Sequence, residues 1–227
     1  GFALAKKVSN LTRTTDWSKL HGIILMKHGI FSFSNDAKES YERMIDLVSD
    51  AELVLKERPN LGESHGEVSL LEIAKLRSAV SKSANIPMIA AFNGLPFNYE
   101  FASQKDVVSI ACRGPLTPDH VIRTKRIPMI TDMDISNSVE RYRSDYIKYF
   151  ERHASSELQQ LDPAPRWAVW RDIGTVVFGR TQKEIKVVSD IVDHTIQAIQ
   201  DAERLGGWVT LAERDIFDVE YWELEQA

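Results

Sequence analysis

The chain has 227 residues, 43% hydrophobic and 27% charged, which is the balance of a globular protein with one large or two small domains. Its net charge is −5 without a long basic run, and no apolar run approaches the roughly 20 residues of a membrane-spanning helix, so the sequence argues against binding to nucleic acid or membrane. The single cysteine, Cys112, excludes an internal disulfide and a multi-cysteine metal site, and its apolar neighbours favour an inert core thiol. We therefore expect a cytoplasmic protein.

The first predicted elements are a short helix over Phe2–Leu11 and two short strands. Gly22–Met26 is an apolar run that suits a buried strand, and Ile30–Phe33 alternates apolar and polar residues as a half-buried strand does. The strands are separated by a Lys-His-Gly turn that contains His28. A histidine in this place can be a metal ligand, a general base or a hydrogen-bonded core residue, and the residues alone favour the last of these.

A long amphipathic helix is predicted next, over Ala37–Leu55. It begins with the spacing of a capping box, in which Asp36 accepts a backbone N–H and Glu39 reaches back. The polar, proline- and glycine-containing segment Lys56–Gly66 then reads as a linker. This organisation predicts one unit over residues 1–62 and a second over 63–227.

The second unit is predicted to alternate helices with short strands. In chain order the pattern indicates a capped helix over Ser69–Ser83, a strand within Ile86–Phe92, a helix over Phe101–Cys112, a polar loop over Leu116–Lys125, an aromatic-striped helix over Ser138–Leu158, two strands within Arg166–Val177, a helix over Gln182–Glu203 and a strand over Phe217–Trp222. The aromatic stripe predicts a core or a subunit interface. The expected fold is layered α/β, with helices packed on a central sheet that contains antiparallel hairpins.

The loop around residues 119–125 carries the second candidate site. His120, Arg123 and Lys125 together can bind an anion or phosphate, with Arg123 as a fork and Lys125 as a point charge. The alternative, which the residues favour, is a loop braced by internal salt bridges.

The sequence also contains an internal repeat. Gly22–Glu39 aligns without a gap on Trp167–Glu184, and both copies contain a strand, a break, a second strand and a capped helix. His28 of the first copy corresponds to Ile173 of the second. We interpret the second copy as a degenerate duplicate of the first.

The Lys-His-Gly-Ile-Phe turn that contains His28, with the helix after it, resembles the class II aldolase/adducin family. The segments RGPLTPDHVIRTKR (113–126), LDPAPRWAVW (161–170) and EYWELEQA (220–227) resemble the middle region of bacterial proteins described as bifunctional rhamnulose-1-phosphate aldolase/short-chain alcohol dehydrogenases. The resemblance implies retro-aldol cleavage of a phosphorylated ketose, with His28 as a ligand of Zn²⁺. It also implies that the other ligands and a catalytic glutamate lie upstream of the histidine turn.

Because only 27 residues precede His28 and none supplies those ligands, we expect a fragment with an incomplete site and negligible aldolase activity. Residues 1–62 would be the C-terminal part of one aldolase-like domain, and residues 63–227 a degenerate second one. NAD(P) would bind only to a dehydrogenase part outside this chain, since no glycine-rich nucleotide loop is present. The alternative is a noncatalytic, adducin-like scaffold, and either reading favours a homo-oligomer.

Overall fold

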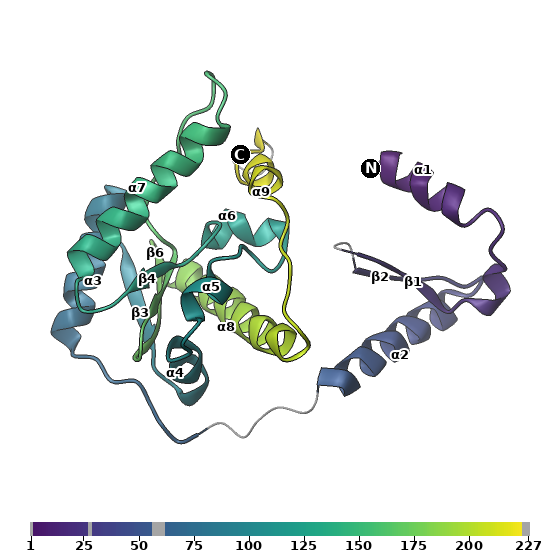
Figure 1. Cartoon of the computed structure of the whole chain (residues 1–227), viewed down its shortest axis with the longest axis horizontal. Coiled ribbons are helices and arrows are strands. Elements are labelled where there is room, and N and C mark those ends of the chain that lie inside the picture. Colours follow the sequence, from purple (N-terminus) through teal and green to yellow (C-terminus); the bar gives the residue numbers. More distant parts are fainter. Residues whose placement is uncertain (1, 27–28, 56–61, 224–227) are drawn as a thin grey trace. The chain divides into compact units, whose positions relative to one another are not determined.

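The computed structural model describes residues 2–26, 29–55 and 62–223, and it divides the chain into two compact units, Gly1–Pro59 and Asn60–Ala227 (Figure 1). His28 lies outside the described residues, as does part of the predicted linker. Among the helices that the structure describes, none is both long and apolar enough to cross a membrane.

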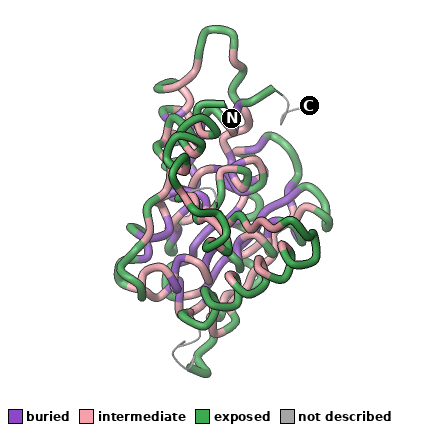
Figure 2. Tube along the Cα trace, turned by 90° about the vertical axis from the view of Figure 1, so that its right-hand side faces the viewer, coloured by how far each residue is buried: buried purple, intermediate pink, exposed green. Residues whose placement is uncertain are grey.

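The first unit has a β-hairpin between a short helix and a long helix. Its elements are α1 (Phe2–Leu11), a 3₁₀ turn (Trp17–Lys19), β1 (Gly22–Leu25), β2 (Gly29–Ser32) and α2 (Ala37–Leu55). The positions of the predicted helices and strands are thus confirmed, but the expectation that Gly22–Met26 is a buried strand is wrong, because Ile24 of β1 is 69% exposed. In the cap of α2, the Asp36 carboxylate accepts the Glu39 N–H at 2.9 Å, whereas the Glu39 carboxylate accepts from the Ser34 hydroxyl. None of the described residues of this unit is buried (Figure 2).

The second unit is built on a four-stranded sheet with the order β3-β6-β5-β4. Its strands are β3 (Ile89–Asn93), β4 (Met129–Thr131), β5 (Trp167–Trp170) and β6 (Gly174–Gly179). Its helices are α3 (Leu70–Ala84), α4 (Pro96–Ala102), α5 (Val107–Ala111), the 3₁₀ turn Pro118–His120, α6 (Val121–Thr124), α7 (Ile135–His153), α8 (Gln182–Arg204) and α9 (Glu213–Glu220). β6 pairs antiparallel with both β3 and β5, whereas β4 runs parallel to β5.

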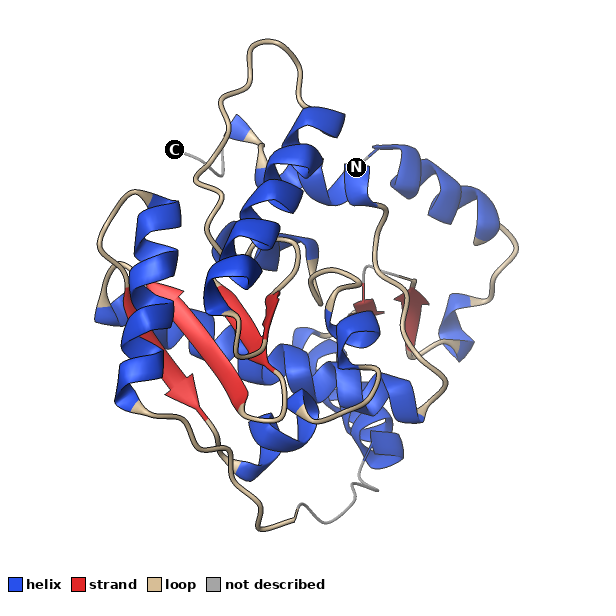
Figure 3. Cartoon of the chain, turned by 60° about the vertical axis from the view of Figure 1, so that its left-hand side comes forward, coloured by secondary structure: helices blue, strands red, loops and turns tan. Residues whose placement is uncertain are grey.

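Helices cover both faces of this sheet, so the predicted layered α/β fold is confirmed (Figure 3). Alternation along β5 decides the faces: Ala168 and Trp170 pack with α3, α7 and α9, whereas Trp167 and Val169 pack with α4, α5 and α8. Every residue of β5 and β6 is buried, as expected for strands covered on both sides.

The repeat is visible in the local structure of the two hairpins. Leu25 lies opposite Gly29 in the first, and Trp170 lies opposite Gly174 in the second, which are equivalent positions of the sequence alignment. Both glycines have positive φ, +101° and +150°. Each hairpin leads into a helix that begins one residue after its cap, Asp36 or Thr181.

The single helix predicted over Phe101–Cys112 is wrong, because the chain forms α4 and α5 with a break between them. Phe101, Val107 and Ile110 are all buried in one cluster. At about 100° per residue, a continuous helix would point the apolar residues of this segment in all directions. The break lets two short helices bury them together.

The polar loop predicted over Leu116–Lys125 instead contains the 3₁₀ turn and α6, with Val121 fully buried. The strand predicted over Phe217–Trp222 is also wrong, because this segment belongs largely to α9. Phe217 and Tyr221 lie one helical turn apart and stack with ring centroids 4.5 Å apart. Their burial against α7 outweighs the alternation that suggested a strand.

The aromatic stripe of α7 is core. Tyr142, Tyr146 and Tyr149 are buried within the chain, and Tyr149 packs edge-on against Phe217. The aromatic stripe therefore forms part of the core of the chain, which is the first of the two predicted alternatives. The homo-oligomer stays a prediction.

Candidate functional site

The site is organised around Lys125, which follows α6 directly. Its backbone has φ 61° and ψ 173°, a conformation that residues other than glycine rarely adopt. The conformation is held by a hydrogen bond from the Lys125 N–H to the Val121 carbonyl at 3.0 Å and by one from the Thr124 hydroxyl to the Lys125 carbonyl, also 3.0 Å. Such strain persists where the surroundings fix it and is concentrated at functional sites.

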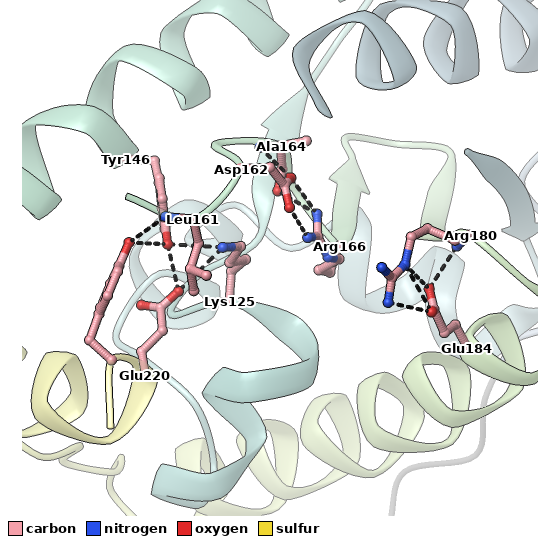
Figure 4. Close-up of polar contacts among 10 residues, drawn as sticks. Lys125, Tyr146, Leu161, Asp162, Ala164, Arg166, Arg180, Glu184 and Glu220 are labelled. Atoms are coloured by element: carbon pink, nitrogen blue, oxygen red, sulfur yellow. Dashed lines mark hydrogen bonds and ion pairs between the residues drawn. The ribbon is translucent and has the colours of Figure 1, made fainter. Parts of the chain in front are cut away.

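The amine of Lys125 is buried in a network of hydroxyl and carboxyl groups (Figure 4). Its Nζ donates to the Tyr146 hydroxyl at 2.9 Å and lies 3.5 Å from Glu220 Oε1. Tyr146 lies 2.8 Å from both Glu220 Oε1 and the Tyr221 hydroxyl. Only 5% of the Lys125 side chain and 1% of the Glu220 side chain are exposed. The ion pair is therefore almost completely removed from water.

Burial changes the acidity of this network. It lowers the pKa of Lys125 from 10.5 to about 8, because desolvation disfavours the charged amine more than Glu220 stabilises it. Burial raises the pKa of Tyr221 to about 12 and that of Tyr146 further. Lys125 therefore loses its proton at a lower pH than either Tyr146 or Tyr221.

The stability of the protein should therefore rise with pH through Lys125. Between pH 8 and 10.5 the unfolded chain keeps the lysine proton that the folded chain has lost, so the free energy of unfolding increases. We expect the free energy of unfolding of the wild type, minus that of Lys125→Met, to increase by about 2–3 kcal/mol between pH 7 and pH 10. Urea unfolding of both proteins at several pH values measures it, and a difference that stays constant or falls would contradict it.

Lys125 and Glu220 line a cavity of about 700 Å³. Five cationic side chains line it, those of Arg123, Lys125, Arg166, Arg180 and Lys183. They face three carboxylates, those of Asp162, Glu184 and Glu220. The excess of positive charge in a concave site favours an anionic ligand.

Two arginines of the cavity are fixed by carboxylates (Figure 4). Arg166 donates to Asp162 Oδ1 at 3.0 Å, and Arg180 donates through Nε to Glu184 Oε1 at 3.0 Å. Burial would raise the pKa of Asp162, but the hydrogen bonds and charge of Arg166 outweigh it and keep this pKa low. Guanidinium groups oriented in this way suit the recognition of phosphate or carboxylate.

The unit that contains this cavity matches a known protein family. Residues 68–227 match the family described as the second domain of class II aldolases. The chain belongs to this class II aldolase family. The resemblance seen in the sequence is confirmed at this level.

The chain is also similar to three more distant proteins. It is 26% identical over 250 residues to the uncharacterized oxidoreductase YuxG of Bacillus subtilis (strain 168), an alignment that covers 99% of this chain and 36% of that protein. YgbL, a putative aldolase/epimerase/decarboxylase, has a TM-score of 0.43 with this chain in crystal structures from Klebsiella pneumoniae and Escherichia coli. These two are 12% and 13% identical, cover 64% and 65% of this chain, and are covered to 63% and 65% of their own length.

The metal that the aldolase family implies does not fit the described part of the chain. Within residues 2–26, 29–55 and 62–223, no three His, Cys, Asp or Glu side chains converge as a ligand set. Cys112 is only partly buried, but burial raises the pKa of its thiol to about 11, as in an unreactive cysteine.

The residues of the predicted anion site of this aldolase domain separate in the structure. Arg123 and Lys125 line the cavity, with Arg123 exposed and Lys125 buried. His120 is not among the lining residues, and its pKa is lowered by burial and by nearby His194. Anion binding by these three residues stays a prediction.

The sequence reasoning missed most residues of the cavity and network, among them Tyr146, Arg166, Arg180 and Glu220. Tyr146 was visible as part of the aromatic stripe, but nothing in that pattern marks its hydroxyl. Glu220 lies 74 residues from Tyr146 along the chain, so no local spacing connects them. Only the packing of α9 against α7 places the carboxylate beside the lysine.

Proposed function

We propose that this chain is part of a metal-dependent class II aldolase that cleaves a phosphorylated ketose, such as rhamnulose 1-phosphate. The match of residues 68–227 to the second domain of class II aldolases carries the proposal. We further propose that the whole protein is fused to a short-chain dehydrogenase. The oxidoreductase name of YuxG, of which this chain covers 36%, is compatible with that fusion.

In this proposal the second unit binds the phosphate of the sugar. Arg123 and Arg180 line the 700 Å³ cavity and are exposed, so both can reach a ligand. Arg180 keeps a fixed orientation through Glu184, at 3.0 Å and 2.9 Å for its Nε and Nη2. A phosphate would bind these guanidinium groups, sharing that of Arg180 with the Glu184 carboxylate. Its negative charge would offset the excess positive charge of the cavity.

The first unit is proposed to be the C-terminal part of an aldolase-like domain, with His28 as one metal ligand. Its described residues leave large apolar side chains exposed, including Ile24, Phe31 and Leu53. Exposed apolar side chains of this kind are what a further part of an aldolase-like domain would cover. The remaining ligands and the catalytic acid would lie in residues that precede this chain in the whole protein.

The test compares this chain with a longer, extended form that also contains the residues preceding it in the parent protein. We expect bound Zn²⁺ and release of dihydroxyacetone phosphate from rhamnulose 1-phosphate only in the extended form. Elemental analysis and a coupled assay measure both, and His28→Ala in the extended form should lower metal content and activity together. Activity of the short chain with stoichiometric zinc would overturn the incomplete-site reading, and inactivity of both forms would favour the noncatalytic scaffold.

A further inference from the structure

The burial of Lys125 calls for an explanation beyond anion binding. A lysine that served only to attract phosphate would work best as an exposed, fully charged ammonium group. Lys125 is instead 5% exposed, sits on a strained backbone and is held at 2.9 Å by a tyrosine hydroxyl. Burial of an ion pair also contributes little to stability compared with apolar packing.

The neighbours of Lys125 provide what an amine nucleophile needs. Glu220, 3.5 Å from Nζ, can take the ammonium proton, and Tyr146 bridges the two groups. Both Lys125 and Glu220 are among the residues that line the basic cavity, where a small carbonyl compound would approach the amine. The lowered pKa of Lys125, about 8, agrees with this role, because only the neutral amine attacks carbonyl carbon.

We propose that Lys125 forms a reversible imine with a small phosphorylated aldehyde or ketone whose phosphate is held by the arginines of the cavity. The choice of a phosphorylated ligand rests on the proposed function, whereas imine formation rests on the Lys125 network itself.

The step balances without an added reagent. Glu220 accepts a proton from the Lys125 ammonium, and the neutral amine adds to the carbonyl carbon to form a C–N bond. The carbinolamine oxygen leaves as water, taking up the proton that Glu220 returns, and a protonated imine remains on Lys125. The net change is one ammonium and one carbonyl giving one iminium and one water.

The protonated imine would act as an electron sink for the carbon next to it. Arg123 and Arg180 line the same cavity and are exposed, so they can hold the phosphate while the carbonyl faces Lys125.

Reductive trapping tests the inference. The full 227-residue chain is incubated with dihydroxyacetone phosphate or with dihydroxyacetone, reduced with cyanoborohydride, digested and mapped by mass spectrometry. We expect an adduct at Lys125 with the mass of the probe less one oxygen, at least tenfold above that at exposed lysines. Lys125→Arg, which keeps the charge but forms no imine, should abolish this adduct, and Lys148→Arg, an exposed lysine of α7, should leave it unchanged.

The outcomes separate the two proposals. Saturable binding of dihydroxyacetone phosphate in titration calorimetry without an adduct at Lys125 would overturn the imine and leave the phosphate site standing. Equal trapping of both probes at Lys125 would support the imine and count against phosphate recognition. If Lys125→Arg does not fold, the adduct map of the wild type decides, and labelling spread over exposed lysines would overturn the inference.

Discussion

Replacing Glu220 with glutamine is expected to lower the free energy of unfolding by about 3–5 kcal/mol at pH 7, because it leaves the buried Lys125 ammonium without its carboxylate. Urea denaturation followed by circular dichroism measures the loss. The hydrogen bond from Tyr146 to Glu220, 2.8 Å long, is altered by the same change and contributes to the effect.

The double variant Lys125→Met/Glu220→Gln separates the charge from the packing. Because it removes the buried charge together with its partner, it should be less destabilised than the sum of the two single variants. Asp218→Asn is the matched control, since Asp218 lies on α9 and pairs with Arg214 at 3.0 Å, with both side chains more than half exposed. It should cost less than about 1 kcal/mol. A loss for Glu220→Gln no larger than that of Asp218→Asn would contradict the network described here.

Gly174→Ala is expected to cost about 3–4 kcal/mol, through strain and a backbone clash together. Gly174 begins β6 with φ +150°, and a Cβ there would lie 2.4 Å from the Asn93 carbonyl oxygen and 3.1 Å from Gly94 Cα. Neither backbone atom can move without disturbing β3, which pairs with β6 at this point. Thermal or urea unfolding of the variant gives the cost.

The control for this variant is Gly206→Ala. Gly206 also has positive φ, +107°, but a Cβ there meets no atom within 4 Å. Its substitution should therefore show the strain alone, about 1–2 kcal/mol. If the two variants lose the same stability, the close packing of the β5–β6 turn against β3 is not what requires glycine at position 174.

The elements that the sequence predicted well are those specified by neighbours in the chain. The Ser69–Glu72 capping box forms as its spacing indicates, with hydrogen bonds in both directions. The long helix α8 follows from its apolar periodicity and from the cap at Thr181. The two hairpins of the repeat could be aligned because a strand, a glycine turn and a cap each leave a local trace.

The segments that were predicted wrongly are those whose apolar residues serve a distant surface. The aromatic and apolar pattern of Phe217–Trp222 suggested a strand, and only the packing of Phe217 and Tyr221 against α7 selects the helix α9. The sequence around Phe101 and Val107 suggests one helix. Two helices form because both residues are buried in the same cluster, on the sheet face that α8 covers. Burial against partners far along the chain decides between local alternatives of similar free energy.

By itself, the sequence determined the layered α/β class and the resemblance to class II aldolases. It also predicted a duplicated hairpin and helix and named His28, His120, Arg123 and Lys125 as candidate site residues, which stay predictions. It could not determine that Lys125 is buried, strained and paired with Glu220. The reason is physical: the acidity and reactivity of an amine depend on its solvation and on charges within a few ångströms. Those distances are set by the docking of α9 against α7, which only the tertiary structure provides.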